Sequence, residues 1–124
     1  MSDEFIKIAR QEILIELDGL EAIIAFCNND EQIFKNSKEI EGHLHKIKGL
    51  APMMGDEIIG EIAKISDTVT KHIIQDGSLG GSYMFIVESI QSMKNLFNGQ
   101  KNIFANDINK KAREMFPCIS DWQS

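Results

Sequence analysis

The chain of 124 residues has the size of one ordinary domain, and its hydrophobic fraction of 43% suffices for a single core. Its formal net charge of −6 disfavours non-specific binding to nucleic acid or to an anionic membrane surface. No apolar run approaches the roughly 20 residues that cross a bilayer, and residues 1–4 are acidic where a signal peptide is basic. Cys27 and Cys118 have no short metal-ligand spacing, which predicts reduced thiols. We therefore expect one cytoplasmic domain over residues 1–124 that binds neither nucleic acid nor membrane.

Hydrophobic periodicity predicts an all-helical chain, because apolar residues recur every three or four positions while alternating strand patterns are scarce. A first helix is expected over about 3–27, with Ser2 as its cap and acidic residues at its positive end. Asn29 and Gln32 resemble a capping box, which predicts the start of a second helix. That helix should end near Pro52, which has no backbone N–H to donate. The apolar face of the first helix consists of Phe5, Ile8, Ala9, Ile13, Leu17, Leu20 and Ile24.

Further helices are expected in the second half of the chain. A third follows the capping residue Asp56, and a fourth begins at Ser82 after the glycine-rich loop 76–81. A weaker helix over about 102–116 comes last. Short connections between four amphipathic helices favour antiparallel neighbours. The predicted fold is therefore an all-α, antiparallel up-and-down four-helix bundle over about 3–98 with an additional C-terminal helix.

His45 lies one position after the apolar residue Leu44, about 100° around the predicted second helix from it. Glu41 lies one turn before His45 and Lys48 one turn after, both within side-chain reach on a helix. Gly49 follows, and a glycine inside a helix costs about 1 kcal/mol relative to alanine, which indicates close approach by another backbone. Imidazole is near neutral at physiological pH, so one ring nitrogen is a nucleophile and a hydrogen bond can hold the other.

The segment His45-Lys46-Ile47-Lys48-Gly49-Leu50-Ala51, followed by Met54-Gly55, resembles the signature of the histidine-phosphotransfer family. It is most similar to the N-terminal phosphotransfer domain of chemotaxis-type histidine kinases, over about Phe5 to Phe97. The resemblance implies that His45 accepts a phosphoryl group from a histidine kinase or a phosphorylated receiver. It also implies transfer to an aspartate of a response-regulator receiver domain, in two-component or chemotaxis-type signalling, by a monomeric protein. In that role Lys48 offsets phosphoryl charge and Gly49 gives the receiver access to the ring.

The resemblance and the helix geometry name different carboxylates as the partner of the imidazole. In the chemotaxis-type domains a glutamate on the third helix orients the ring, and the matching position here is Asp67. The same domains often carry a histidine three residues earlier, where this chain has Lys64, a candidate phosphate contact. Glu41 is the rival carboxylate, since it lies one turn before His45 on the same helix. The sequence leaves this choice open.

Other functions receive less support from the sequence. His43 and His45 project about 200° apart on a helix and cannot share one ion there, so no metal site is predicted. The chain has no glycine-rich phosphate loop, which predicts no cofactor and no kinase module of its own. The alternative is a helical adaptor that docks a receiver or kinase and transfers nothing. The pair His45 and Lys48 favours the phosphocarrier over the adaptor.

Overall fold

The computed structural model describes residues 2–120 and 122, and within them it contains six α-helices and no strand. The four long helices are α1 (Asp3–Ile24), α3 (Ser37–Met53), α4 (Glu57–Asp76) and α5 (Ser82–Phe97). A short helix, α2 (Asp30–Lys35), precedes α3, and α6 (Ala105–Met115) comes last. The predicted all-helical class is confirmed, and the arrangement is compatible with a four-helix bundle carrying an extra C-terminal helix. None of the described helices is both long and apolar enough to cross a membrane.

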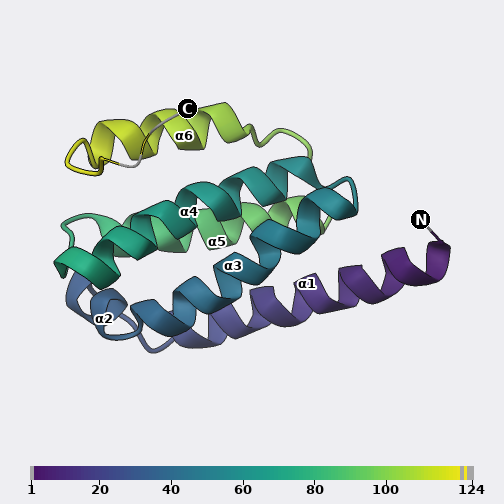
Figure 1. Cartoon of the computed structure of the whole chain (residues 1–124), viewed down its shortest axis with the longest axis horizontal. Helices are drawn as coiled ribbons and strands as arrows, with labels where there is room; N and C mark the ends of the chain where they lie inside the picture. The colour runs from purple at the N-terminus through teal and green to yellow at the C-terminus, as the bar shows by residue number, and fades with distance from the viewer. Residues whose placement is uncertain (1, 121, 123–124) are drawn as a thin grey trace.

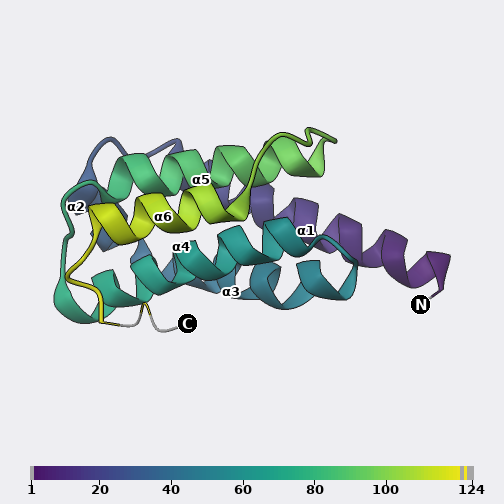
Figure 2. The ribbon, with the colours of Figure 1, turned by 90° about the horizontal axis from the view of Figure 1, so that it is seen from above.

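The long helices lie side by side along the longest axis of the molecule (Figure 1). α3 packs chiefly on α4 and also on α1, while α5 packs on α4 and α1. α6 lies across α4 and α5 on the side away from α1, as the view from above also shows (Figure 2). The arrangement places α3 and α4, the two helices that carry the candidate site, in the most extensive contact of the fold.

The core is built from the predicted apolar faces. Five residues of the apolar faces predicted for the helices are instead exposed, namely Phe5 (40%), Ile8 (59%), Ile58 (39%), Phe104 (58%) and Met115 (36%). Phe5 and Ile8 lie in the first turns of α1, which extends beyond the other helices (Figure 1), so no neighbour covers them. Fully buried side chains from the four long helices include Ile13, Leu17, Leu20, Ile40, Leu44, Ile47, Ile62, Val69, Ile73, Ile86 and Met93.

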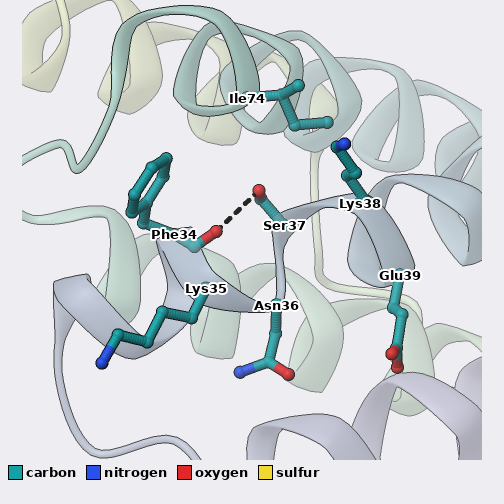
Figure 3. Close-up of a pocket in the computed structure, with 7 residues that line it drawn as sticks. All are labelled: Phe34, Lys35, Asn36, Ser37, Lys38, Glu39 and Ile74. Carbon is teal, nitrogen blue, oxygen red and sulfur yellow. Dashed lines mark hydrogen bonds between the residues drawn. The ribbon is translucent and has the colours of Figure 1, made fainter.

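The predicted second helix is broken in two at Asn36. The Asn36 amide donates to the carbonyl of Gln32 at 2.8 Å, and the Ser37 hydroxyl donates to the carbonyl of Phe34, also at 2.8 Å. Side chains of these types compete with backbone hydrogen bonds, which explains the end of α2 and the new start of α3. Figure 3 shows the open pocket at this junction, lined by Phe34, Lys35, Asn36, Ser37, Lys38, Glu39 and Ile74.

Two predicted caps at the start of helices are present. Ser2 accepts a hydrogen bond from the backbone N–H of Phe5 at 3.2 Å, and Asn29 accepts one from Gln32 at 3.0 Å. The Gln32 side chain accepts in turn from the backbone N–H of Asn28. The first helix ends at Ile24, three residues before the predicted boundary.

The predicted cap at Asp56 does not form, and the start of α5 is capped by Asp30, for which the sequence analysis predicted no role. Asp56 occupies the N-cap position of α4, but its side chain makes no capping hydrogen bond and lies 3.7 Å from the Arg10 guanidinium of α1. The start of α5 is capped from a distance, by Asp30 at the start of α2. The Asp30 carboxylate accepts from the backbone N–H groups of Gly81 at 3.0 Å and Tyr83 at 2.7 Å. Asp30 therefore joins α2 to α5 across the loop that precedes α5.

α3 and α4 approach closely at one end, where Pro52 in the last turn of α3 packs on Gly60 of α4. A Cβ atom at Gly60 would lie 2.8 Å from Cγ of the Pro52 ring. A Cβ atom at Gly42, inside α3, would meet nothing within 4 Å. Gly60 is therefore required by packing, whereas Gly42 is not.

We predict that Gly60→Ala lowers the free energy of unfolding by about 1–3 kcal/mol, because the added methyl group pushes the two helices apart. The matched variant Gly42→Ala should raise it by about 0.5–1 kcal/mol through the higher helix propensity of alanine. Urea denaturation followed by circular dichroism measures both values. Equal effects of the two substitutions would contradict the close approach at Pro52.

Candidate functional site

The candidate site lies where α3 and α4 run next to each other. α3 contributes Glu41, His45 and Lys48, and α4 contributes Asp67 and Lys71. The buried neighbours of His45 on α3, Leu44 and Ile47, hold this helix against the core. The His45 side chain itself is 64% exposed, more open than its expected position at the margin of the apolar face. The ring is therefore accessible to a macromolecular partner.

Asp67 is a buried charge with two cationic partners. Only 1% of the residue is exposed. Its Oδ2 atom accepts from Lys48 Nζ at 2.9 Å across the two helices, and lies 3.2 Å from Lys71 Nζ, one turn later on α4. Its Oδ1 atom is buried and accepts no hydrogen bond within the described part of the chain. Such a group is costly to bury, which explains the two ammonium groups at Oδ2.

Both carboxylates proposed as partners of the imidazole lie close to it. Glu41 Oε2 is 3.9 Å from His45 Nδ1, within ion-pair distance and too long for a hydrogen bond. One ring nitrogen of His45 and one oxygen each of Glu41 and Asp67 lie within 4.8 Å of one another. The choice between the two carboxylates therefore stays open, with Glu41 beside the ring and Asp67 bound to the lysines.

The pKa of Glu41 is raised and the pKa of Asp67 is lowered, and each group contributes to the shift of the other. Hydrogen bonding to Asp67 raises the pKa of Glu41, and burial adds to that shift. Burial alone would raise the pKa of Asp67, but hydrogen bonds from Glu41, Lys48 and Lys71 outweigh it and lower that pKa. Asp67 thus keeps its negative charge while Glu41 retains a proton to higher pH than an ordinary glutamate.

Lys64 and Gly49, two other predicted site residues, are exposed. The Lys64 ammonium has no ion-pair partner among the described residues, so Lys64 lies outside the charge cluster around Asp67. A Cβ atom at Gly49 would meet nothing within 4 Å, so no part of the described fold requires this glycine for packing. Gly49 leaves the surface one turn beyond His45 open.

Lys71 is the site residue that the sequence analysis missed. It lies four residues after Asp67 on the same helix, and this spacing alone would have indicated the ion pair. Hydrogen bonding to Asp67 raises the pKa of Lys71, so its ammonium stays charged. The two lysines bound to Asp67 are therefore Lys48 and Lys71, whereas the sequence analysis named Lys48 and Lys64.

The other two histidines are held by their own contacts. His43 Nδ1 lies 2.7 Å from Oε1 of the buried Glu16, and the His43 ring packs on Gly19 of α1. His72 Nδ1 lies 3.1 Å from Asp76, and its side chain is 19% exposed. His45 is the most exposed of the three histidines in the chain.

Comparisons of the chain with protein-family models, with curated protein sequences and with solved structures each find no match. The function is therefore argued from the geometry of the site.

We predict that Glu41→Gln stabilises the protein at neutral pH by roughly 0.5–1 kcal/mol, the net value of one hydrogen bond. The glutamine amide donates to Asp67 without adding a second negative charge. Because the pKa of Glu41 is raised in the fold, the folded wild-type protein holds a proton that the unfolded chain has lost, and its stability falls as pH rises through that window. Urea denaturation at neutral pH and near the ordinary glutamate pKa measures the difference between wild type and variant.

The gain from Glu41→Gln should shrink at the lower pH, where wild-type Glu41 is itself protonated. Glu61→Gln removes an exposed carboxylate from α4 and is the matched control, for which we expect no such pH dependence. A destabilising effect of Glu41→Gln at neutral pH would show that the carboxyl groups do not oppose each other.

Proposed function

We propose that this protein is a histidine phosphotransfer protein in which His45 carries the phosphoryl group. A histidine kinase or a phosphorylated receiver donates the group, and an aspartate of a response-regulator receiver domain accepts it. The observation that carries the proposal is an exposed imidazole beside a buried carboxylate that holds two ammonium groups. This arrangement combines an accessible nucleophile with nearby positive charge, the two requirements of a phosphohistidine site.

The chemistry needs little from the protein beyond position and charge. A ring nitrogen of His45 attacks phosphorus, a nitrogen–phosphorus bond forms, and the bond from phosphorus to the donor's oxygen breaks. The phosphoryl group brings between one and two negative charges to the surface of α3. Lys48, 30% exposed and anchored on Asp67, lies one turn from the ring and offsets part of this charge. Lys64 is exposed on α4, three residues before Asp67, and remains a candidate contact for the phosphoryl group.

The shape of the surface around His45 supports docking of a second protein. Gly49 and Met53 follow His45 at intervals of four residues, so the three residues share one face of α3. Gly49 leaves open space there, and Met53 is 51% exposed. Exposed apolar side chains beside a reactive group favour recognition by a partner. In the proposed function the extra helix α6 lies away from this face, and the four long helices act as an antiparallel bundle that presents α3.

We predict that phosphoramidate, a small phosphoryl donor, labels the protein at one histidine and that His45→Gln abolishes the label. The label should be lost in acid and kept in base, as expected for a phosphorus–nitrogen bond. Intact-protein mass spectrometry and phosphorus NMR measure the modification. Because His45 is exposed, the substitution should leave the circular dichroism spectrum unchanged.

His72→Gln is the matched control for this experiment, since His72 also lies one turn from a carboxylate on a helix. It should leave labelling unchanged. Labelling that persists in His45→Gln would overturn the assignment of the site, and absence of any histidine label would favour the helical adaptor.

A second prediction concerns access to His45. Gly49→Gln should slow phosphoryl transfer from His45 to a chemotaxis-type receiver domain by about tenfold or more, because the new side chain fills the space that the receiver's loops need. Labelling by phosphoramidate, which is small, should be unchanged and serves as the internal control. The substitution should also stabilise the fold by roughly 0.5–1 kcal/mol, because it replaces a helical glycine in open space. Unchanged transfer to the receiver would remove Gly49 from the docking face.

A further inference from the structure

The residues around His45 form a second kind of site. Glu41 and His45 lie four residues apart on α3, the spacing at which two side chains on one helix face chelate a metal ion. Asp67 of the facing helix α4 supplies a third ligand, and one donor atom from each residue lies within 4.8 Å of the others. Helical bundles commonly build metal sites in this way, from carboxylates and histidines on facing helices.

A separate observation at Asp67 also points to a cation. Lys48 and Lys71 both bind Oδ2, while Oδ1 is buried and accepts no hydrogen bond within the described residues. A buried carboxylate oxygen without a donor is costly, and a cation between Asp67 and Glu41 would satisfy it. The lysines leave this oxygen free for such an ion.

We propose that Glu41, His45 and Asp67 bind a divalent transition-metal ion, for which Zn²⁺ is the best fit. One imidazole nitrogen with two carboxylate oxygens suits Zn²⁺, whereas Ca²⁺ and Mg²⁺ take oxygen ligands only. Zinc bonds of about 2.0–2.2 Å place tetrahedral ligands roughly 3.3–3.6 Å apart, so the three groups need to close by about 1 Å. His45 is exposed on the surface and can move that far. Water completes the coordination at the open side.

The sequence analysis predicted no metal site because it considered only the spacing of histidines and of cysteines, and not carboxylates on a facing helix. The structure supplies the missing partners from one turn earlier on α3 and from α4. Lys71 should weaken metal binding, because its ammonium group competes with the ion for the negative charge of Asp67. Its side chain is 51% exposed and can turn into solvent when the ion binds. Removing Lys71 should therefore strengthen metal binding, whereas removing any of the three ligands should weaken it.

Zinc binding has a consequence for phosphoryl transfer, and this consequence alone depends on the proposed function. A metal on one ring nitrogen draws electron density from the imidazole and makes the other nitrogen a weaker nucleophile. It also fixes the ring toward Glu41 and away from a partner. Zn²⁺ would therefore inhibit phosphorylation of His45 by competing for the same ring.

The experiment is calorimetric titration of the purified full chain with zinc chloride, without any phosphoryl donor. We expect one ion per chain, and at least a tenfold weaker affinity for each of His45→Gln, Glu41→Gln and Asp67→Asn. Lys71→Gln should bind more tightly than wild type, because the competing cation is gone. His72→Gln removes a partly buried histidine that is paired with Asp76 and has no third ligand among the described residues, and it should bind like wild type. Circular dichroism checks that each variant is folded.

Binding that survives His45→Gln, or that disappears in Cys118→Ser, would overturn the site, because Cys118 is an exposed thiol that can bind zinc alone. Weaker binding by Lys71→Gln would also overturn it. If zinc binds as proposed but phosphoramidate leaves no label on the metal-free protein, the metal site stands and the phosphotransfer function fails. If the metal-free protein is labelled and zinc does not bind, the phosphotransfer function stands and the metal site fails.

Discussion

The buried carboxylate of Asp67 is the constraint on which the site depends. A charge that is almost fully buried requires partners, and the two lysines that supply them come from both helices of the α3–α4 pair. Lys48 joins the helices directly, so the ion pair fixes which turn of α3 faces which turn of α4. One turn further along α3, toward the loop that joins the two helices, Pro52 against Gly60 sets how closely the helices approach. Together these two contacts place His45 beside Asp67.

The Asp67 carboxylate interacts with several neighbouring groups. Ammonium groups occupy Oδ2, and the raised pKa of Glu41 means that a proton on the neighbouring carboxyl group also offsets the charge of Asp67. The imidazole of His45 lies within 4.8 Å of an oxygen of each of these carboxyl groups. Under the proposed function, a phosphoryl group on the ring would draw Lys48 away from Asp67 and so weaken this ion pair.

The sequence was a good guide to features that repeat along a helix and a poor guide to those between helices. The helical class followed from apolar spacing, and Ser2 and Asn29 were identified as caps because their partners are three residues away. The break at Asn36 was missed because the apolar periodicity continues through it. Asp56 was assigned a local cap, but its carboxylate lies near Arg10 of a distant helix.

In the candidate site, too, residues on one helix were predictable from the sequence, and contacts between helices were not. The neighbours of His45 on α3 were predicted from their spacing, whereas the place of Asp67 came only from a family resemblance. Its burial and its two lysine partners depend on the packing of α4, which no local pattern reveals. Lys71 had a local signal, an ion-pair spacing to Asp67, that was not used.

The cap that Asp30 provides for α5 has a consequence for the order of folding. Asp30 and Gly81 are 51 residues apart in the chain, so the first turn of α5 lacks its cap until α2, α3 and α4 have assembled. Most helices can begin from their own flanking residues, as α1 does from Ser2. The amides of Gly81 and Tyr83 thus become protected from hydrogen exchange only with the assembled tertiary structure. Their exchange rates report assembly of the bundle, whereas those in the middle of α5 report the helix itself.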